Sequence, residues 1–175
     1  MMRGADKITI LGIDPALSVT GYGIISINPD DLTLVDFGEI KTAGKNALAY
    51  RLHKIYSGIR DVIAKNRPDI AVLEEGFYSK NIRIALSLGQ ARGAAMVACA
   101  DCGIEVRLYA AREIKQAVAG RGSASKEQVA YMVKALLDIG DDRLNSFDIT
   151  DSLGAAICAA QKLDAEENHV RIHKR

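Results

Sequence analysis

Residues 10–25 read ILGIDPALSVTGYGII, and this stretch decides the fold. The apolar run ILGI at 10–13 leads directly into Asp14, and Pro15 then ends the predicted strand because proline lacks the donor that a strand ladder needs. A second apolar run follows within a few residues, which predicts a neighbouring strand. Asp before Pro is also a common turn opening, so the rest of the chain has to explain why a buried strand ends in a carboxylate.

The composition is that of one ordinary globular domain. Of 175 residues, 49% are hydrophobic and 26% are charged, and a chain of this length buries about 70% of its unfolded surface around one core. No run approaches the roughly 18 apolar residues of a membrane span, and Asp14 interrupts the first apolar run too early for a signal peptide. We expect one domain over residues 1–164, a polar and flexible tail over 165–175, no membrane association and a cytoplasmic protein.

Cysteine usage predicts reduced thiols. Three cysteines without a signal peptide do not form a secreted disulfide framework. Cys99 and Cys102 have CxxC spacing, but the pair ends an apolar helical stretch and has no second pair and no His nearby. Small buried side chains are therefore preferred to a metal site.

Charge is distributed unevenly along the chain, although the formal net charge is only +1. Residues 79–134 carry nine Lys and Arg against four Asp and Glu, whereas residues 135–168 carry eight acids against two bases. Solvated helix faces can produce this asymmetry, and so can a surface that binds a polyanion such as nucleic acid. Charge alone leaves both interpretations open.

The spacing of apolar residues predicts alternating strands and helices. The expected strands are 7–13, 21–27, 32–41, 70–74 and 105–109, and the expected helices are 46–66, 81–101, 111–118, 125–138 and 148–163. NPDD at 28–31 predicts a hairpin turn, and the helix before the fourth strand predicts a crossover that lays this strand parallel to a central one. Ser125 and Gln128 form a predicted capping box. Gly89 and Gly93 would allow close helix packing, within the core or across a dimer.

Two glutamates end the fourth strand in the stretch IAVLEE. Glu74 and Glu75 stand at the edge where open α/β sheets bind ligands. If the first and fourth strands are parallel neighbours, one glutamate lies about one strand spacing, ~5 Å, from Asp14. Alternation sends the two side chains to opposite faces, and spacing alone does not select between them.

In SFDITDSLGAAI, Asp148 and Asp151 are three residues apart at the start of a helix and therefore share a face. The helix dipole accounts for an acid at Asp148. It accounts poorly for Asp151, because the same face must turn inward to bury the alanines that follow, and buried acids need a partner. A divalent cation would neutralise this cluster. Carboxylates suit Mg²⁺ or Mn²⁺, and two ions ~4 Å apart are the usual arrangement for phosphodiester cleavage.

Four blocks in this order resemble the RuvC family of Holliday junction resolvases, which has a ribonuclease-H-like fold. The blocks are ILGIDPALSVTGYGII, LEEGFYSKNIRIALSLGQARGAAM, AAREIKQAVAGRGSASKEQV and DITDSLGAAI, and they cover most of the chain. The resemblance implies a mixed five-stranded sheet flanked by helices, in an endonuclease that cuts four-way junction DNA by symmetric paired nicks. It also implies two Mg²⁺ ions per subunit, replaceable by Mn²⁺, a homodimer, and a branch-migration helicase complex as partner.

The resemblance also assigns roles to individual residues. The family's metal-binding acids fall on Asp14, Glu74, Asp148 and Asp151. Lys115 and Lys126 fall on the family's basic residues near the scissile phosphate. Lys126 stands at the start of a predicted helix, where the helix dipole disfavours a cation, and this favours a functional role for it. Phe77 falls on an aromatic that packs against junction bases, although it could equally pack beneath its own loop. The remaining predicted DNA contacts are Lys80, Arg83, Arg92, Arg112 and Arg121.

Two positions depart from the family pattern, and two alternative functions remain. Ala16 stands where the family usually has Gly, and Gly154 lies within a predicted helix at a cost of up to ~1 kcal/mol relative to Ala.

GIDPALSVTGYG also resembles the phosphate loop of actin-like ATPases and sugar kinases, but that fold normally needs two such domains. A non-catalytic binder of DNA structures is the third hypothesis, which the intact set of acids disfavours.

Overall fold

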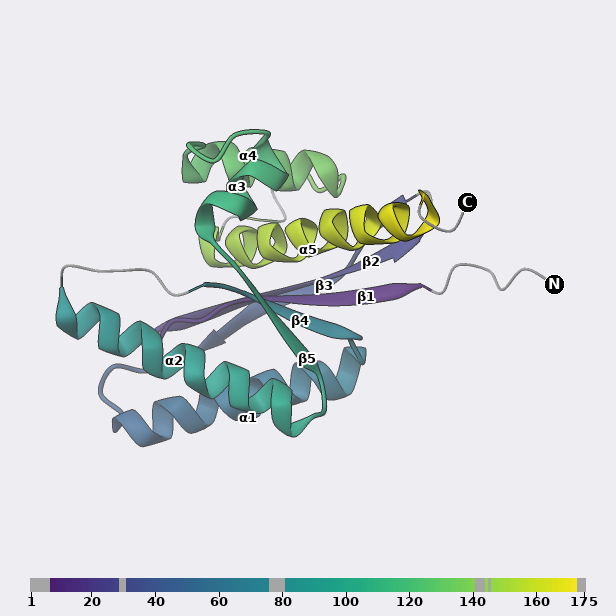
Figure 1. Cartoon of the computed structure of the whole chain (residues 1–175). Helices are drawn as coiled ribbons and strands as arrows, with labels where there is room; N and C mark the ends of the chain where they lie inside the picture. Colours follow the sequence, from purple (N-terminus) through teal and green to yellow (C-terminus); the bar gives the residue numbers. More distant parts are fainter. Residues whose placement is uncertain (1–6, 29–30, 76–80, 141–143, 145, 173–175) are drawn as a thin grey trace.

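The structure is a computed structural model that describes residues 7–28, 31–75, 81–140, 144 and 146–172, with side chains described to residue 165. A five-stranded sheet lies between two layers of helices (Figure 1). Helices α1 (Leu48–Asn66) and α2 (Ile82–Asp101) cover one face of the sheet. Helices α3 (Ala111–Ala119), α4 (Lys126–Leu136) and α5 (Phe147–Ile172) cover the other.

The sheet is mixed, as predicted. Its strands are β1 (Ile8–Asp14), β2 (Val19–Asn28), β3 (Asp31–Lys41), β4 (Ile70–Glu74) and β5 (Glu105–Tyr109), in the spatial order β3-β2-β1-β4-β5. The first three strands pair antiparallel, whereas β4 is parallel to β1 and β5 is parallel to β4. The crossover through α1 is confirmed, since it places β4 beside the central strand. Residues 29–30 of the predicted hairpin turn lie outside the described residues.

Alternation along the central strand divides the core into two layers. Ile10 is buried against the α3–α5 layer, and Leu11 is buried against the α1–α2 layer. Helices therefore cover both faces of β1 and β4, which explains why these strands are almost continuously apolar. Of the three cysteines, Cys99 and Cys158 are buried in these layers, Cys102 is half-buried, and all three thiols are free.

Helix ends differ from the prediction more than strand ends do. The last helix was expected to stop at residue 163 but continues to Ile172, because nothing in the polar segment after Leu163 breaks a helix. On α4, Leu136 follows the helical spacing of the buried Val129 and Val133 but is 41% exposed, while Leu137 is buried after the helix ends. The Ser125–Gln128 capping box is confirmed: the Gln128 amide donates to Ser125 Oγ at 3.3 Å, and the Ser125 amide donates to Gln128 Oε1 at 3.0 Å.

Three glycines let α5 lie directly on the antiparallel part of the sheet. A Cβ on Gly12 or Gly23 would collide with the backbone or a side chain of α5. A Cβ on Gly21 would lie 3.0 Å from Asp148 Cβ and closer still to the Asp148 carbonyl group. Close approach of the two backbones therefore requires glycine here, and it brings the start of α5 to the end of β1.

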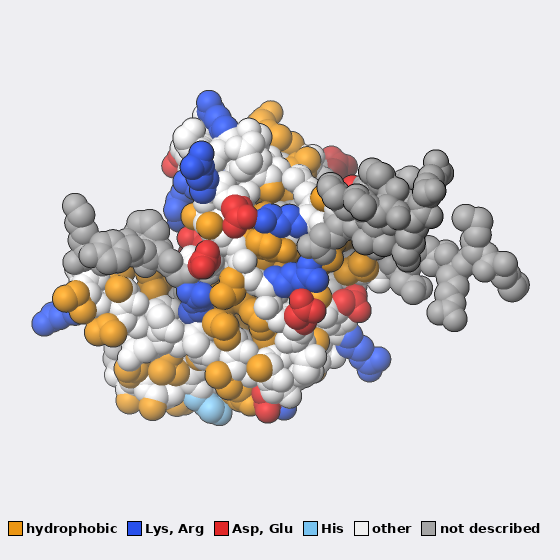
Figure 2. All heavy atoms as spheres, viewed as in Figure 1, with side chains coloured by type: hydrophobic (Ala, Val, Ile, Leu, Met, Phe, Trp, Pro, Cys, Tyr) orange, Lys and Arg blue, Asp and Glu red, His pale blue; other side chains and the backbone are white. Residues whose placement is uncertain are grey.

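The outer face of α2 packs against nothing in the described part of the chain. A Cβ on Gly89 or Gly93 would meet no atom within 4 Å, so close packing of these glycines within the core is wrong. Apolar side chains stand exposed on the same helix, at Ile82, Ile84, Leu86 and Val97. Figure 2 shows hydrophobic side chains at the surface over α2. Across the described residues, no helix is long and apolar enough to cross a membrane.

Candidate active site

Two carboxylates end neighbouring parallel strands. Asp14 is the last residue of β1 and Glu74 is the last residue of β4, and the strand register pairs the residues just before them. Both carboxyl ends therefore meet at one edge of the sheet, near the start of α5 (Figure 1). Glu75 is exposed, and its backbone amide donates to the Tyr109 carbonyl at 2.7 Å. Of the two glutamates that alternation left open, Glu74 is the one that joins Asp14.

Helix α5 brings the other two predicted acids to this edge. Asp14 is paired with Gly21 across β1 and β2, and Gly21 is the residue against which the Asp148 backbone packs. Asp151 lies one turn further along α5 and is half-buried. The four acids, separated by up to 137 positions (14 to 151) in the sequence, are thus gathered by two strand ends and one helix.

The electrostatics of Asp14 show how close these acids are. Its pKa is raised from 3.8 to about 7, chiefly by burial and then by the negative charges of Asp151 and Asp148, with a smaller contribution from Glu74. The Lys126 ammonium opposes this rise in pKa. A carboxyl that titrates near neutrality is poorly stabilised in its charged form. The side chains around Asp14 therefore supply only part of the positive charge that its carboxylate needs.

Two of the other acids are perturbed in the same direction. Burial and the charge of Asp151 raise the pKa of Glu74, against the lowering effect of Lys126 and Lys115. Burial raises the pKa of Asp148 as well, and the neighbouring carboxylates of Glu39 and Asp151 add to the rise. These shared effects place all four acids in one electrostatic cluster.

Lysine side chains reach the cluster from the α3–α4 layer. Lys126, at the first position of α4, donates from Nζ to Asp151 Oδ2 at 2.8 Å, and this bond raises the pKa of Lys126. Its unfavourable place at a helix N-terminus is thus offset by a carboxylate partner. Lys115, on α3, lies close enough to Glu74 for its charge to lower that pKa. Both predicted lysines therefore border the acids.

The donor set suits a hard divalent cation. Carboxylate oxygens are the ligands that Mg²⁺ and Mn²⁺ prefer, and the raised pKa values of Asp14, Glu74 and Asp148 record an excess of negative charge at one place. Within the described ranges, no three His, Cys, Asp or Glu side chains converge on one point as a formed metal site. Asp151 instead accepts a hydrogen bond from the Lys126 ammonium, which supplies part of the positive charge that a metal ion would bring.

Glu39 is a neighbour of the site that the sequence reasoning missed. It lies on β3 opposite Gly21, and hydrogen bonds from Lys41 and Ser146 lower its pKa. Ser146 directly precedes α5, so this contact ties the start of α5 to the sheet two residues before Asp148. Finding Glu39 required the register of β3 on β2, which includes a bulge that no sequence pattern announces.

The loop after Asp14 is held from two sides. Ala16 exchanges hydrogen bonds with the Thr20 hydroxyl, at 2.9 Å and 3.3 Å. Thr42 donates its amide to the Ser18 carbonyl at 3.0 Å, and Arg51 on α1 donates to the Thr42 hydroxyl at 2.8 Å. Ala16 does not have a positive φ. Its departure from the family pattern therefore introduces no backbone strain.

Comparison with known proteins agrees with this geometry. The family model for crossover junction endodeoxyribonuclease RuvC matches residues 10–159. A RuvC from Geobacter metallireducens is 46% identical over 151 residues, which are 86% of this chain and 91% of the relative, and one from Geobacter sulfurreducens is 47% identical over the same shares. The chain belongs to the RuvC family. This membership favours the nuclease hypothesis over the phosphotransfer alternative.

Solved RuvC structures have the same ribonuclease-H-like fold. A structure titled T. thermophilus RuvC in complex with Holliday junction substrate superposes with a TM-score of 0.81 at 30% identity, covering 87% of this chain and 93% of that one. The yeast mitochondrial Holliday junction resolvase Ydc2 matches with a TM-score of 0.60 at 13% identity, over 85% of this chain and 77% of that one. At that identity, the second match supports the fold alone.

The predicted DNA contacts divide into placed and unplaced residues. Phe77 and Lys80 lie outside the described residues. Arg83, Arg112 and Arg121 are exposed, and Arg92 on α2 is half-buried. Lys and Arg side chains gather over the α3–α4 layer, at the upper left of Figure 2. This is the layer that carries Lys115 and Lys126.

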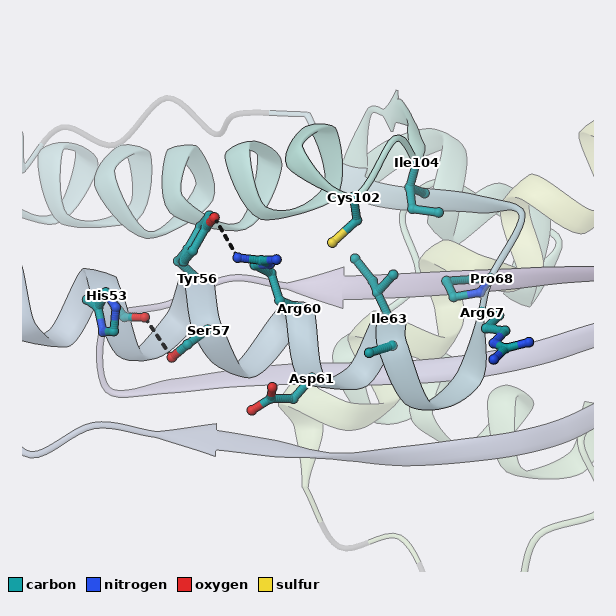
Figure 3. Close-up of a pocket in the computed structure, with 11 residues that line it drawn as sticks. His53, Tyr56, Ser57, Arg60, Asp61, Ile63, Arg67, Pro68, Cys102 and Ile104 are labelled. Atoms are coloured by element: carbon teal, nitrogen blue, oxygen red, sulfur yellow. Dashed lines mark hydrogen bonds between the residues drawn. The ribbon is translucent and has the colours of Figure 1, made fainter.

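A separate hollow of about 610 Å³ lies between α1 and the end of α2, on the other face of the sheet (Figure 3). Of the two arginines that line it, Arg60 is already engaged, with a 3.3 Å hydrogen bond to Tyr56 and a 3.4 Å ion pair to Asp101. Among the described side chains that line it, Asp61 is the only acid. The hollow therefore lacks the group of acids that distinguishes the sheet edge.

Proposed function

We propose that this protein is a metal-dependent Holliday junction resolvase that cuts four-way junction DNA by symmetric paired nicks. The observation that carries the proposal is the gathering of Asp14, Glu74, Asp148 and Asp151 at one sheet edge, with the pKa of Asp14 raised to about 7. Support for the substrate comes from the family and from a relative whose structure is titled as a complex with Holliday junction substrate.

The four acids would hold two Mg²⁺ ions, for which Mn²⁺ can substitute. When bound, the ions supply a water activated for in-line attack on the phosphodiester and stabilise the leaving 3′ oxygen. The protein's contribution is to orient the carboxylates on rigid elements: Asp14 and Glu74 on strand ends, Asp148 and Asp151 on one face of α5. Because the pKa of Asp14 is raised to about 7, a cation held beside it would favour the charged form of this carboxyl.

Lys126 and Lys115 would act on the phosphate. Each already lies beside an acid of the cluster, so each ammonium is within reach of a phosphate held at the same place. Cations fixed at the point where negative charge develops lower the barrier without having to reorganise. Exposed basic side chains such as Arg112 and Arg121 would bind the flanking DNA backbone, which makes binding sensitive to salt.

A homodimer through the outer face of α2 would provide the two cuts. This face exposes Ile82, Ile84, Leu86 and Val97 and the open glycines Gly89 and Gly93. Exposed apolar side chains beside glycines suit close packing against a second copy of the same helix. A two-fold dimer matches the symmetry of a four-way junction, with one strand cut by each subunit. We also assign the protein to homologous recombination and DNA repair, with a branch-migration helicase complex as partner, on the strength of the family.

The test supplies the purified protein with Mg²⁺ and a synthetic four-way junction, beside Asp14→Asn and Glu74→Gln. We expect paired nicks from the wild type, and intact junction binding without nicks from both variants. Glu75→Gln is the matched control, because the neighbouring glutamate is exposed and ends the same segment. Equal cutting of linear duplex and junction would contradict junction selectivity, and full activity of Glu74→Gln would contradict the assigned acids.

A further inference from the structure

A groove of about 280 Å³ opens between α4 and the start of α5. One wall is formed by Glu127, Tyr131 and Lys134 of α4, and the other by Leu144, Phe147 and Thr150. The volume lies just below the usual range of small-molecule sites, about 300–1,000 Å³. This volume is too small to hold a DNA duplex, but it is comparable to the space that a single planar ring system requires.

The groove lies beside the acid cluster along the same two helices, α4 and α5. Glu127 directly follows Lys126, and Thr150 directly precedes Asp151. The ion pair between Lys126 and Asp151, at 2.8 Å, joins the two walls at that end. A nucleotide whose phosphate lies at the four acids would therefore have an adjacent base or sugar within reach of this groove.

Two aromatic side chains stand exposed at the groove. Tyr131 is 70% exposed and Phe147 is 46% exposed, so neither ring is explained by the core. On its other side, Tyr131 lines a second hollow of about 370 Å³, which also includes Arg121. Aromatic rings flanked by cations are the usual surface for stacked nucleic-acid bases, because every base has a π-face and every base carries a phosphate.

We propose that this groove receives one unstacked base next to the phosphate that is cut, with Tyr131 as its stacking platform. The inference rests on the proposed function, since it needs a DNA strand at the four acids. Enzymes that act at distorted DNA hold splayed bases in this way, and the cost of unstacking is lowest where pairing is already disrupted, as at the centre of a junction. Arg121, which lines the hollow on the other side of Tyr131, offers a cation to a phosphate of the same strand.

The test combines protein variants with junctions that lack one base. A series of four-way junctions carries a single abasic site at successive positions flanking the cut, and single-turnover cleavage is measured with wild type and Tyr131→Ala. On the intact junction, we expect Tyr131→Ala to cut about tenfold more slowly, as for loss of a base-stacking ring. At one abasic position the two proteins should cut at the same rate, because the partner of the ring is gone.

Control variants separate stacking from other effects. Tyr131→Phe keeps the ring and should restore the wild-type rate, whereas Tyr50→Ala removes a tyrosine that is 57% exposed on α1 and should leave cutting unchanged. Unfolding temperatures of all variants should agree, since Tyr131 lies on the surface. If the wild type fails to cut any junction, the proposed function and the base site are both wrong. If the wild type cuts but the effect of Tyr131→Ala is absent, or is the same at every abasic position, only the base site is overturned.

Discussion

Replacing Gly21 by Ala should separate Asp148 from Asp14. A Cβ at Gly21 would lie 3.0 Å from Asp148 Cβ and closer to the Asp148 carbonyl, whereas ordinary contact begins at 3.4 Å. Asp148 Cβ would have to retreat by at least 0.4 Å (3.4 minus 3.0) and the carbonyl by more. The Asp148 carbonyl belongs to the backbone and Asp148 Cβ is fixed to it, so no side-chain rotation relieves the clash. The start of α5 must therefore move, by on the order of 1 Å.

The expected cost appears in stability and, more strongly, in cutting. Overpacking of this kind destabilises a fold by about 1–3 kcal/mol. Displacement of a catalytic group by ~1 Å slows a reaction on the order of 100-fold, because the reacting atoms leave their aligned geometry. Junction cleavage under single-turnover conditions measures the rate, and chemical denaturation measures the free energy of unfolding.

Gly154→Ala is the matched control on the same helix. A Cβ there would meet Ile114 at 3.5 Å and Val118 and Val129 at 3.7 Å, all ordinary contacts. Alanine is the better helix former by up to ~1 kcal/mol, so this variant should be as stable as the wild type or more stable, with unchanged cutting. Wild-type cutting by Gly21→Ala, or equal losses in both variants, would refute the argument that close backbone approach at Gly21 places Asp148.

Three further predictions follow from the described contacts. Without metal, the folded state holds a proton on Asp14 up to about pH 7, whereas the unfolded carboxyl releases it near pH 4. The free energy of unfolding in EDTA should therefore fall as pH rises from 4 to 7, by up to about 4 kcal/mol. Asp14→Asn should lose most of this pH dependence in thermal unfolding. Glu39→Ala should slow junction cutting about tenfold by releasing Ser146, whereas Glu39→Gln, which can still accept that hydrogen bond, should cut normally; equal loss in both would mean that the charge of Glu39 matters instead. Leu86→Asp on the exposed α2 face should give monomers in analytical ultracentrifugation, whereas Leu48→Asp, on the exposed start of α1, should not; a dimeric Leu86→Asp protein would place the interface elsewhere.

Local patterns were enough to predict most elements of the fold. Strand β4 and strand β5 have the predicted ends, and the Ser125 cap begins α4 where the capping box indicated. These features depend on short-range chemistry: apolar runs, breakers and side chains that bond their own backbone. The end of α5 was missed because helix can continue through polar residues when its preceding turns are packed on a sheet.

The packing partners of individual residues could not be predicted in the same way. Leu136 and Leu137 are adjacent and equally apolar, yet only Leu137 is buried, because the end of α4 decides which side chain faces the core. Gly89 and Gly93 lie on a helix face with nothing against it in the described residues. Periodicity identifies the apolar face of a helix but not what covers it.

The sequence by itself determined which acids are unusual. Asp14 ends a buried strand, the Glu74–Glu75 pair ends another, and Asp151 stands on a face that must turn inward, so local pattern alone shows that these acids are costly to bury. Only the tertiary structure decided that these acids meet, that Lys126 bonds Asp151, and that Glu39 lies close enough to raise the pKa of Asp148. The physical reason is that electrostatic energy depends on distance through space. That distance is set by strand register and by the glycines that admit α5 to the sheet, which act between segments far apart in the chain.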